Sequence, residues 1–196
     1  VVKRMLAIPA VKDLITDIRT FCAAFRASTN SRAALRLLQK EGGVKQPKIL
    51  IMDVLTRWWS TYSMIVRLLE MHAYVVRDEH ITDLELGARH YMLCRLLKHL
   101  LKPFRDFQVF MEGEKYVTLS WLPSFIEQLR QSLSADAESL RDPTSVLRTG
   151  LRISSAIAEV GHKMCVVGQE AIIEHYRDTD ERFTCARNPT VDPAAA

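Results

Sequence analysis

Residues 93–103 read LCRLLKHLLKP, and this stretch decides the fold class. Its leucines recur at spacings of three and four residues, so they share one broad face of a helix with 3.6 residues per turn. The spacing predicts a helix from about Asp83 to Lys102. Pro103 should kink or restart that helix, because proline cannot donate the helical hydrogen bond.

The same apolar spacing occurs on both sides of this helix. It predicts further helices over about 11–26, 31–41, 60–76, 118–133 and 143–176, with polar loops at 77–82 and 134–142. Residues 49–52 follow Pro47 and are expected to be extended, as a single strand or an edge segment. The seven glycines and seven prolines are too few for the many turns of an all-β protein. We therefore expect an all-α chain of six or seven helices with at most one short strand.

Polar residues and glycines mark where these helices change. Ser28, Asn30 and Ser31 interrupt the first helix and can cap the next, which Gly42 and Gly43 then end. We divide the chain into a helical region over 1–135, a continuing helical segment over 136–186 and a disordered tail over 187–196.

Composition limits the class of protein. Hydrophobic residues make up 48% of the chain, which is typical of a globular domain. Neither a signal peptide nor an apolar run of about 18 residues is present, so we expect no membrane partner. The net charge of +4 permits nucleic-acid binding without requiring it. Four widely spaced cysteines favour reduced thiols in a cytosolic or nuclear protein: Cys22, Cys94, Cys165 and Cys185.

The sequence carries few signs of catalytic chemistry. The sequence contains no GxSxG, P-loop, GxGxxG or HExxH motif. Four residues could in principle gather around zinc, although their spacing fits no common zinc module: His162, Cys165, His175 and Cys185. His72 and His99 lie on apolar helical stripes and are expected to be core or boundary residues. Five acids could bind a metal if they converged, but most acids are simply solvated: Asp53, Asp78, Asp83, Glu112 and Glu114. We assign no catalytic, cofactor-binding or metal-binding residue.

Residues 53–64 carry the most specific pattern. They read DVLTRWWSTYSM and are followed by RLLE at 67–70. This segment resembles the DVxTRWNSTYxM motif of hAT-type DNA transposases, except that Trp59 stands where the family usually has Asn. Three flanking stretches resemble the family in the same order: the series Ser28, Arg32, Leu35 and Gln39, then LLKHLLKPF at 96–104, then EGEKYVTLS at 112–120, with Glu112 where Ser is usual. The resemblance covers roughly residues 11–135.

The resemblance implies a helical insertion within an RNase-H-like transposase. In that family three acids bind Mg²⁺ or Mn²⁺ for strand cleavage, and the insertion separates the second acid from the third. It implies that those acids lie outside this chain, so the chain holds no cofactor itself and its status as an enzyme stays open. The expected partner is DNA at transposon ends, in the nucleus, with homo-oligomers in the full-length family and no small-molecule substrate.

Arg57 and Trp58 are the residues that we predict to contact DNA. An indole offers a flat π-face to an unstacked base, and a guanidinium can hold a phosphate through two hydrogen bonds. The alternative is that Trp58 anchors the core between helices. Asp53 is expected to cap a helix or pair with an arginine rather than to act as a catalytic acid. Five basic residues could touch phosphates or simply be solvated: Arg32, Arg36, Lys40, Lys45 and Lys48.

Three functions fit these observations. The first is a transposase that binds and cuts DNA ends with the help of a metal. The second is a domesticated or decayed relative that keeps the helical scaffold for DNA binding or protein interaction. The third is an unrelated helical scaffold protein with a chance motif.

Overall fold

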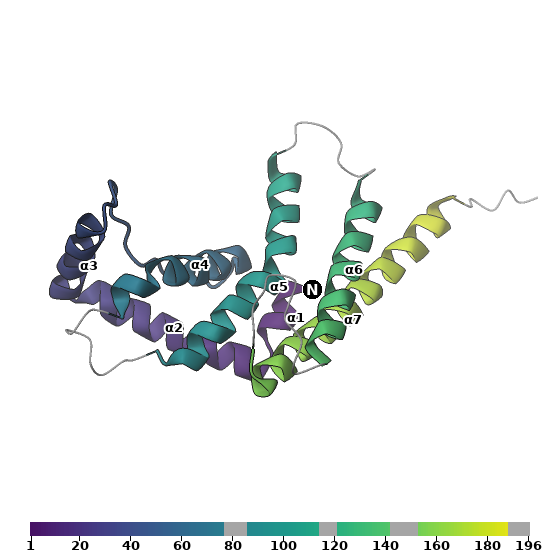
Figure 1. Ribbon diagram of the computed structural model, residues 1–196. Helices are drawn as coiled ribbons and strands as arrows, with labels where there is room; N and C mark the ends of the chain where they lie inside the picture. The colour runs from purple at the N-terminus through teal and green to yellow at the C-terminus, as the bar shows by residue number, and fades with distance from the viewer. Residues whose placement is uncertain (77–85, 114–120, 142–152, 188–196) are drawn as a thin grey trace, which may run out of the picture.

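A computed structural model describes residues 1–76, 86–113, 121–141 and 153–187, the last range in backbone only from residue 176 onward. These ranges contain seven helices and no strand, which confirms the all-α prediction (Figure 1). The helices are α1 (Val2–Leu6), α2 (Pro9–Ala27), α3 (Thr29–Glu41), α4 (Trp58–Val75), α5 (Ala88–Gly113), α6 (Leu122–Arg141) and α7 (Ser155–Arg187). Residues 49–52, predicted to be extended, lie in the irregular segment between α3 and α4.

Helix α5 joins the two halves of the molecule. It packs against α4 on one side and against α6 and α7 on the other. Helices α2 and α3 complete the first half, whereas α1 packs against α7 and touches α2 (Figure 1). Helix α5 therefore contacts both halves, through α4 in the first and through α6 and α7 in the second.

The leucine face predicted for α5 is buried. Leu93, Leu96, Leu97, Leu100 and Leu101 all belong to the main hydrophobic core. Each such side chain stabilises the fold by about 2 kcal/mol through burial. The helix continues past Pro103 to Gly113, and Figure 1 shows that it changes direction along its length. The predicted proline kink is confirmed, and the helix includes residues 112 and 113.

The junction between α2 and α3 follows the predicted capping. Ser28 Oγ accepts a hydrogen bond from the backbone N–H of Ser31 at 3.1 Å. At the other end of α3, Gly42 is the C-cap and Gly43 has a φ of +80°, a conformation that favours glycine.

The predicted loop at 134–142 is wrong for residues 134–141, because α6 runs through to Arg141. Leu133, Ala137 and Leu140 are buried at helical spacing, and this face outweighs the polar residues between them. Asp136 is also buried, and it lies 3.1 Å from His99 Nε2 of α5. Asp136 is one of the polar residues that predicted a loop, and its contact with His99 explains why it can be buried in a helix instead.

Other helix boundaries in the structure also differ from the predicted ones. Leu86 and Gly87 precede α5, so that helix begins later than Asp83, and residues 77–85 lie outside the described part. The last helix begins at Ser155 rather than near Pro143 and continues to Arg187. The predicted tail over 187–196 lies outside the described residues except for Arg187, which ends α7. The proposed division at residue 135 falls inside α6, which is one continuous helix.

Packing accounts for the three cysteines whose side chains the structure describes, and for His72. Cys22, Cys94 and Cys165 are buried free thiols, and desolvation raises the pKa of each to about 12. They therefore stay protonated at neutral pH. The His72 ring lies 3.9 Å from that of Tyr91, in keeping with the predicted boundary role. None of the helices, as far as the structure describes them, is long and apolar enough to span a membrane.

Candidate nucleic-acid interface at the start of α4

Side chains of α3 and α4 hold the irregular segment that joins these two helices. Gln39, which is fully buried, accepts a hydrogen bond from the Lys48 N–H at 2.8 Å and donates one to the Lys48 carbonyl at 2.8 Å. The carbonyl of the next residue, Ile49, accepts a hydrogen bond from Arg67 of α4 at 3.1 Å. These contacts give the backbone of an otherwise unpaired segment its hydrogen-bond partners. The segment is thereby fixed against α3 and α4.

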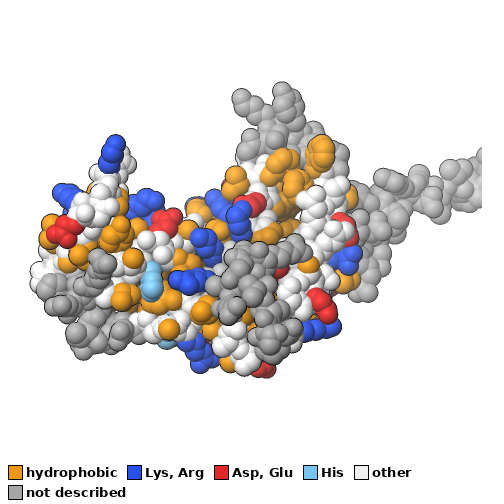
Figure 2. All heavy atoms as spheres, in the orientation of Figure 1, with side chains coloured by type: hydrophobic (Ala, Val, Ile, Leu, Met, Phe, Trp, Pro, Cys, Tyr) orange, Lys and Arg blue, Asp and Glu red, His pale blue; other side chains and the backbone are white. Residues whose placement is uncertain are grey.

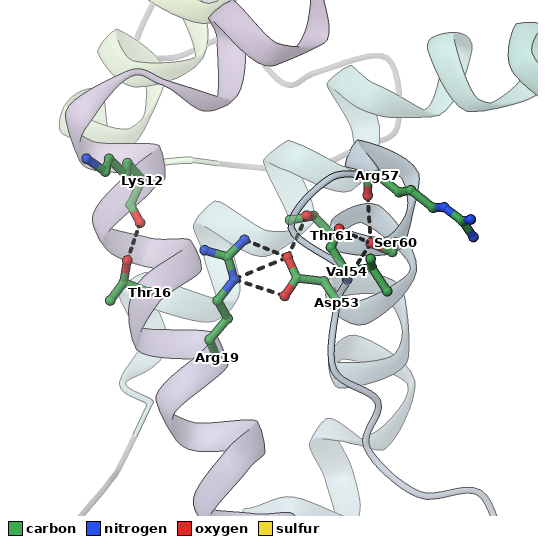
Figure 3. Close-up of polar contacts among 8 residues, drawn as sticks. All are labelled: Lys12, Thr16, Arg19, Asp53, Val54, Arg57, Ser60 and Thr61. Atoms are coloured by element: carbon green, nitrogen blue, oxygen red, sulfur yellow. Dashed lines mark hydrogen bonds and ion pairs between the residues drawn. The ribbon is translucent and has the colours of Figure 1, made fainter.

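Asp53 is the second anchor of this segment. Its carboxylate accepts hydrogen bonds from Arg19 Nε at 2.9 Å and Arg19 Nη2 at 2.6 Å, and from Thr61 Oγ1 at 2.7 Å (Figure 3). The Asp53 side chain is only 2% exposed, whereas Arg19 is 31% exposed. The prediction that Asp53 pairs with an arginine is confirmed. Its partner lies on α2, 34 residues earlier in the chain.

The environment of Asp53 favours its charged form. Burial alone would raise its pKa, but hydrogen bonds from Arg19 and Thr61 and the charge of Arg19 outweigh burial and lower the pKa below its ordinary value. A carboxylate that is charged and fully engaged by Arg19 and Thr61 is a structural group. It is not poised to exchange protons in a reaction.

This shifted pKa predicts a loss of stability in acid. In the unfolded chain the Asp53 pKa is about 3.9, and in the folded protein it is lower. The pair therefore stabilises the fold fully above about pH 4, and this contribution disappears as the pH falls through the folded-state pKa. The measurement is urea unfolding of the wild type and Asp53→Asn across this acid range. The stability difference between them should shrink as the pH falls, and a constant difference would contradict the assignment.

Ser60 shapes the turn that leads into α4. Its Oγ accepts a hydrogen bond from the Val54 N–H at 2.7 Å and lies 2.6 Å from the Arg57 carbonyl. The Arg57 N–H in turn donates to the Val54 carbonyl at 2.9 Å. Arg57 is the N-cap residue of α4, and no side chain caps this helix end. The Ser60 N–H donates to the Arg57 carbonyl at 2.9 Å, whereas the N–H groups of Trp58 and Trp59 lie uncapped at the positive end of the helix dipole.

The two predicted DNA-binding residues have different surroundings. Arg57 is exposed, points away from the Arg19–Asp53 pair, and has no acidic partner among the described residues (Figure 3). Trp58 is half-buried and packs against the hydrophobic core. The Arg57 guanidinium is therefore accessible to a ligand. Trp58, in contrast, is partly occupied by its packing against the core.

Trp59 lies beside two guanidinium groups. Arg57 Cζ is 6.0 Å and Arg105 Cζ is 5.2 Å from the centroid of its ring. Both distances are in the range of cation–π attraction. Arg105 belongs to α5 just after Pro103, so this contact joins the start of α4 to the second part of α5.

The remaining candidates do not form a second site. Three of the five basic residues, Arg32, Arg36 and Lys40, lie on the exposed face of α3, and Lys48 pairs with Glu70 at 3.3 Å. No three His, Cys, Asp or Glu side chains gather as metal ligands within the described ranges. Cys165 is buried and the His162 ring is near Arg141. Asp78, Asp83, Glu114 and the Cys185 side chain lie outside the described residues.

The sequence did not assign to this region three residues that build it: Gln39, Arg19 and Arg105. Gln39 carried a signal, since a glutamine four residues after the buried Leu35 falls on the buried face of α3. Arg19 was visible only as a basic residue late in its helix. No sequence signal pairs Arg105 with Trp59.

Comparison with known proteins gives one family-model match, which covers part of the chain. Residues 1–89 match the family model described as the ZBED1 RNase-like helical domain. No curated protein and no solved structure matches the chain. The matched part contains α1 to α4 and includes Arg57, Trp58 and Trp59, but not Arg105. The N-terminal part of the chain is therefore similar to a transposase-derived, RNase-like helical domain.

Proposed function

We propose that this chain is the helical insertion region of a hAT-type transposase or of a protein derived from one, and that it contacts DNA through Arg57 and Trp58. One observation carries the proposal. The segment leading to Arg57 is fixed by Gln39 and by the Arg19–Asp53 pair, yet it ends in an exposed guanidinium with no acidic partner in the described part of the chain. Fixing a backbone so firmly positions a charged group for a ligand.

The surroundings of Arg57 suit a DNA phosphate. The open N–H groups at the start of α4 and the helix dipole favour an anion at this end. The neighbouring Asp53 carboxylate is neutralised by Arg19, so it does not repel one strongly. Trp58 packs against the core and is only half-buried, so part of this side chain would remain available to a nearby base.

The family resemblance extends the proposal to the whole protein. The metal-binding acids, with Mg²⁺ or Mn²⁺, would belong to an RNase-H-like core outside this chain, and the chain itself would hold no cofactor. Its partner would be DNA at transposon ends, in the nucleus, within a homo-oligomer, and without a membrane or small-molecule partner. In this proposal the chain supplies DNA contacts but not the cleavage chemistry.

Replacing Arg57 with alanine should weaken DNA binding about five- to tenfold, because one charge-assisted phosphate contact is lost. The logarithmic salt dependence of binding should also fall by about one unit. The measurement is fluorescence anisotropy of the 196-residue chain with branched and single-stranded DNA over a salt series. Trp58→Phe, which keeps an aromatic ring, should bind DNA more tightly than Trp58→Ala.

Arg36→Ala is the matched control for Arg57→Ala, since Arg36 is an exposed arginine of α3 with no acidic partner among the described residues. An equal loss of DNA affinity in the two variants would mean that binding depends on the total charge of the chain rather than on an arginine at the start of α4. Absence of wild-type binding to either DNA would reject the proposal.

The second candidate function is a transposase-derived scaffold for protein interaction. The packing of Trp58 against the core and the exposed Val54 and Leu55 beside it favour this alternative. Leu55 is 79% exposed, which is unusual for a large apolar side chain on a firmly anchored segment. A folded chain that binds no DNA would support this alternative.

A further inference from the structure

Trp59 joins two arginines that come from different elements. Arg57 precedes α4, and Arg105 lies in α5, two residues after Pro103. An aromatic ring in this position restrains each guanidinium while leaving its edge donors available. On the face shown in Figure 2, Lys and Arg side chains gather near the middle of the molecule, where α4 meets α5 in Figure 1.

Arg105 has hydrogen-bonding capacity that the fold does not use. Its side chain is only 26% exposed, and its Nη1 has no hydrogen-bond partner among the described residues. Glu112 Oε2 is 4.0 Å away, too far for a hydrogen bond, and Glu112 Oε1 already accepts one from Gln108 at 2.6 Å. A buried, unused donor of a charged group is costly to leave unmatched. Nη1 itself is shielded from solvent, so a ligand would reach Arg105 through the part of the side chain that is exposed.

The charges around the ring favour an anion. Lys102 pairs with Asp106 one turn along α5, so these two charges offset each other. Glu112 offsets part of the charge of Arg105, and Arg57 has no acidic partner in the described part of the chain. The uncapped start of α4 adds the positive end of its dipole. The net charge at this position is positive.

We propose that Arg57 and Arg105, both held by Trp59, clamp the phosphodiester backbone of a single nucleic-acid strand. This inference deepens the proposed function and rests on it. Each guanidinium offers paired N–H donors that match the oxygens of one phosphate. Two such groups on one ring would engage one phosphate or two neighbouring phosphates of the same strand. Trp59, which differs from the usual family residue, is thereby given a function.

The ligand group is a phosphate rather than a base. Guanidinium groups already lie over the Trp59 ring, so a base would have to displace one of them in order to stack there. A phosphate binds the free edges of the same groups and leaves the cation–π contacts in place. Binding at this clamp should therefore not depend on sequence.

The test compares Arg105→Gln with Arg95→Gln in the 196-residue chain. Arg95 is an exposed arginine of the same helix, far from Trp59 and without an acidic partner among the described residues, so both variants lose one charge from α5. The probes are a labelled single-stranded DNA of mixed sequence and an abasic strand of equal length. Circular dichroism checks that each variant keeps its helices.

Arg105→Gln should bind both strands about three- to tenfold more weakly than the wild type and reduce the salt slope by about one, whereas Arg95→Gln should match the wild type. Arg105→Lys, which keeps the charge without the planar donors, should recover only part of the loss. An effect of Arg105→Gln on the mixed-sequence strand but not on the abasic strand would overturn the phosphate assignment. Equal behaviour of the Arg105 and Arg95 variants would overturn the clamp, even if Arg57→Ala still weakened binding and so supported the proposed function.

Discussion

Replacing Asp53 with asparagine should lower the free energy of unfolding by about 3 kcal/mol. Asparagine keeps the shape of the side chain and can still accept a hydrogen bond from Thr61, but it removes the negative charge that Arg19 faces. Because the Asp53 side chain is almost fully buried, the guanidinium is left against an uncharged, poorly hydrated site. Arg19 is partly exposed, so water compensates for some of the loss. The expected effect therefore lies at the lower end of the range for broken buried pairs.

The measurement is the midpoint and slope of urea unfolding at neutral pH. Asp13→Asn is the matched control, because Asp13 is an exposed acid of α2 without a partner among the described residues, and its loss should change stability by less than about 0.5 kcal/mol. Asp53→Asn should also weaken DNA binding, since the anchored segment carries Arg57. A stability change as small as that of the control would show that the Arg19–Asp53 pair does not hold this segment.

Replacing Gly161 with leucine should destabilise the fold by about 3 kcal/mol. A β-carbon at this position would lie 2.9 Å from Leu96 Cδ2 and 3.0 Å from Leu140 Cδ1. Both neighbours are in the buried core, so a larger side chain forces α7 away from α5 and α6. Gly161→Ala should be close to neutral, because its gain of about 1 kcal/mol in helix propensity offsets the shift that its β-carbon requires at the ends of the Leu96 and Leu140 side chains.

Thermal and urea unfolding of the two Gly161 variants provide the measurement. Lys163→Leu introduces the same side chain at an exposed position of α7 and should leave stability nearly unchanged. If Gly161→Leu were as stable as Lys163→Leu, the close approach of α7 to the core would not be required. The glycine would then only weaken the helix, as its propensity alone predicts.

The candidate site combines residues that sequence could and could not find. The motif over residues 53–64 could be identified from the sequence, and it covers the turn into α4, whose hydrogen bonds are local and join residues such as Val54 and Ser60. The partner of Asp53 lies 34 residues earlier, and sequence patterns carry no information about which arginine reaches it. Trp59 was identified as a departure from the family, but its contact with Arg105 depends on how α4 crosses α5. The contact between Trp59 and Arg105 could therefore be found only in the tertiary structure.

The sequence by itself determined the all-α fold, the buried leucine face of α5, the Ser28 cap and the glycine end of α3. These features depend on contacts within a few turns, where helical periodicity and backbone chemistry act directly. Tertiary structure decided that residues 134–141 are helical, that Gly161 permits close packing, and that Asp53 and Trp59 find arginines on other helices. In each case the free energy comes from a partner distant in the chain, and burial between helices outweighs the local preference.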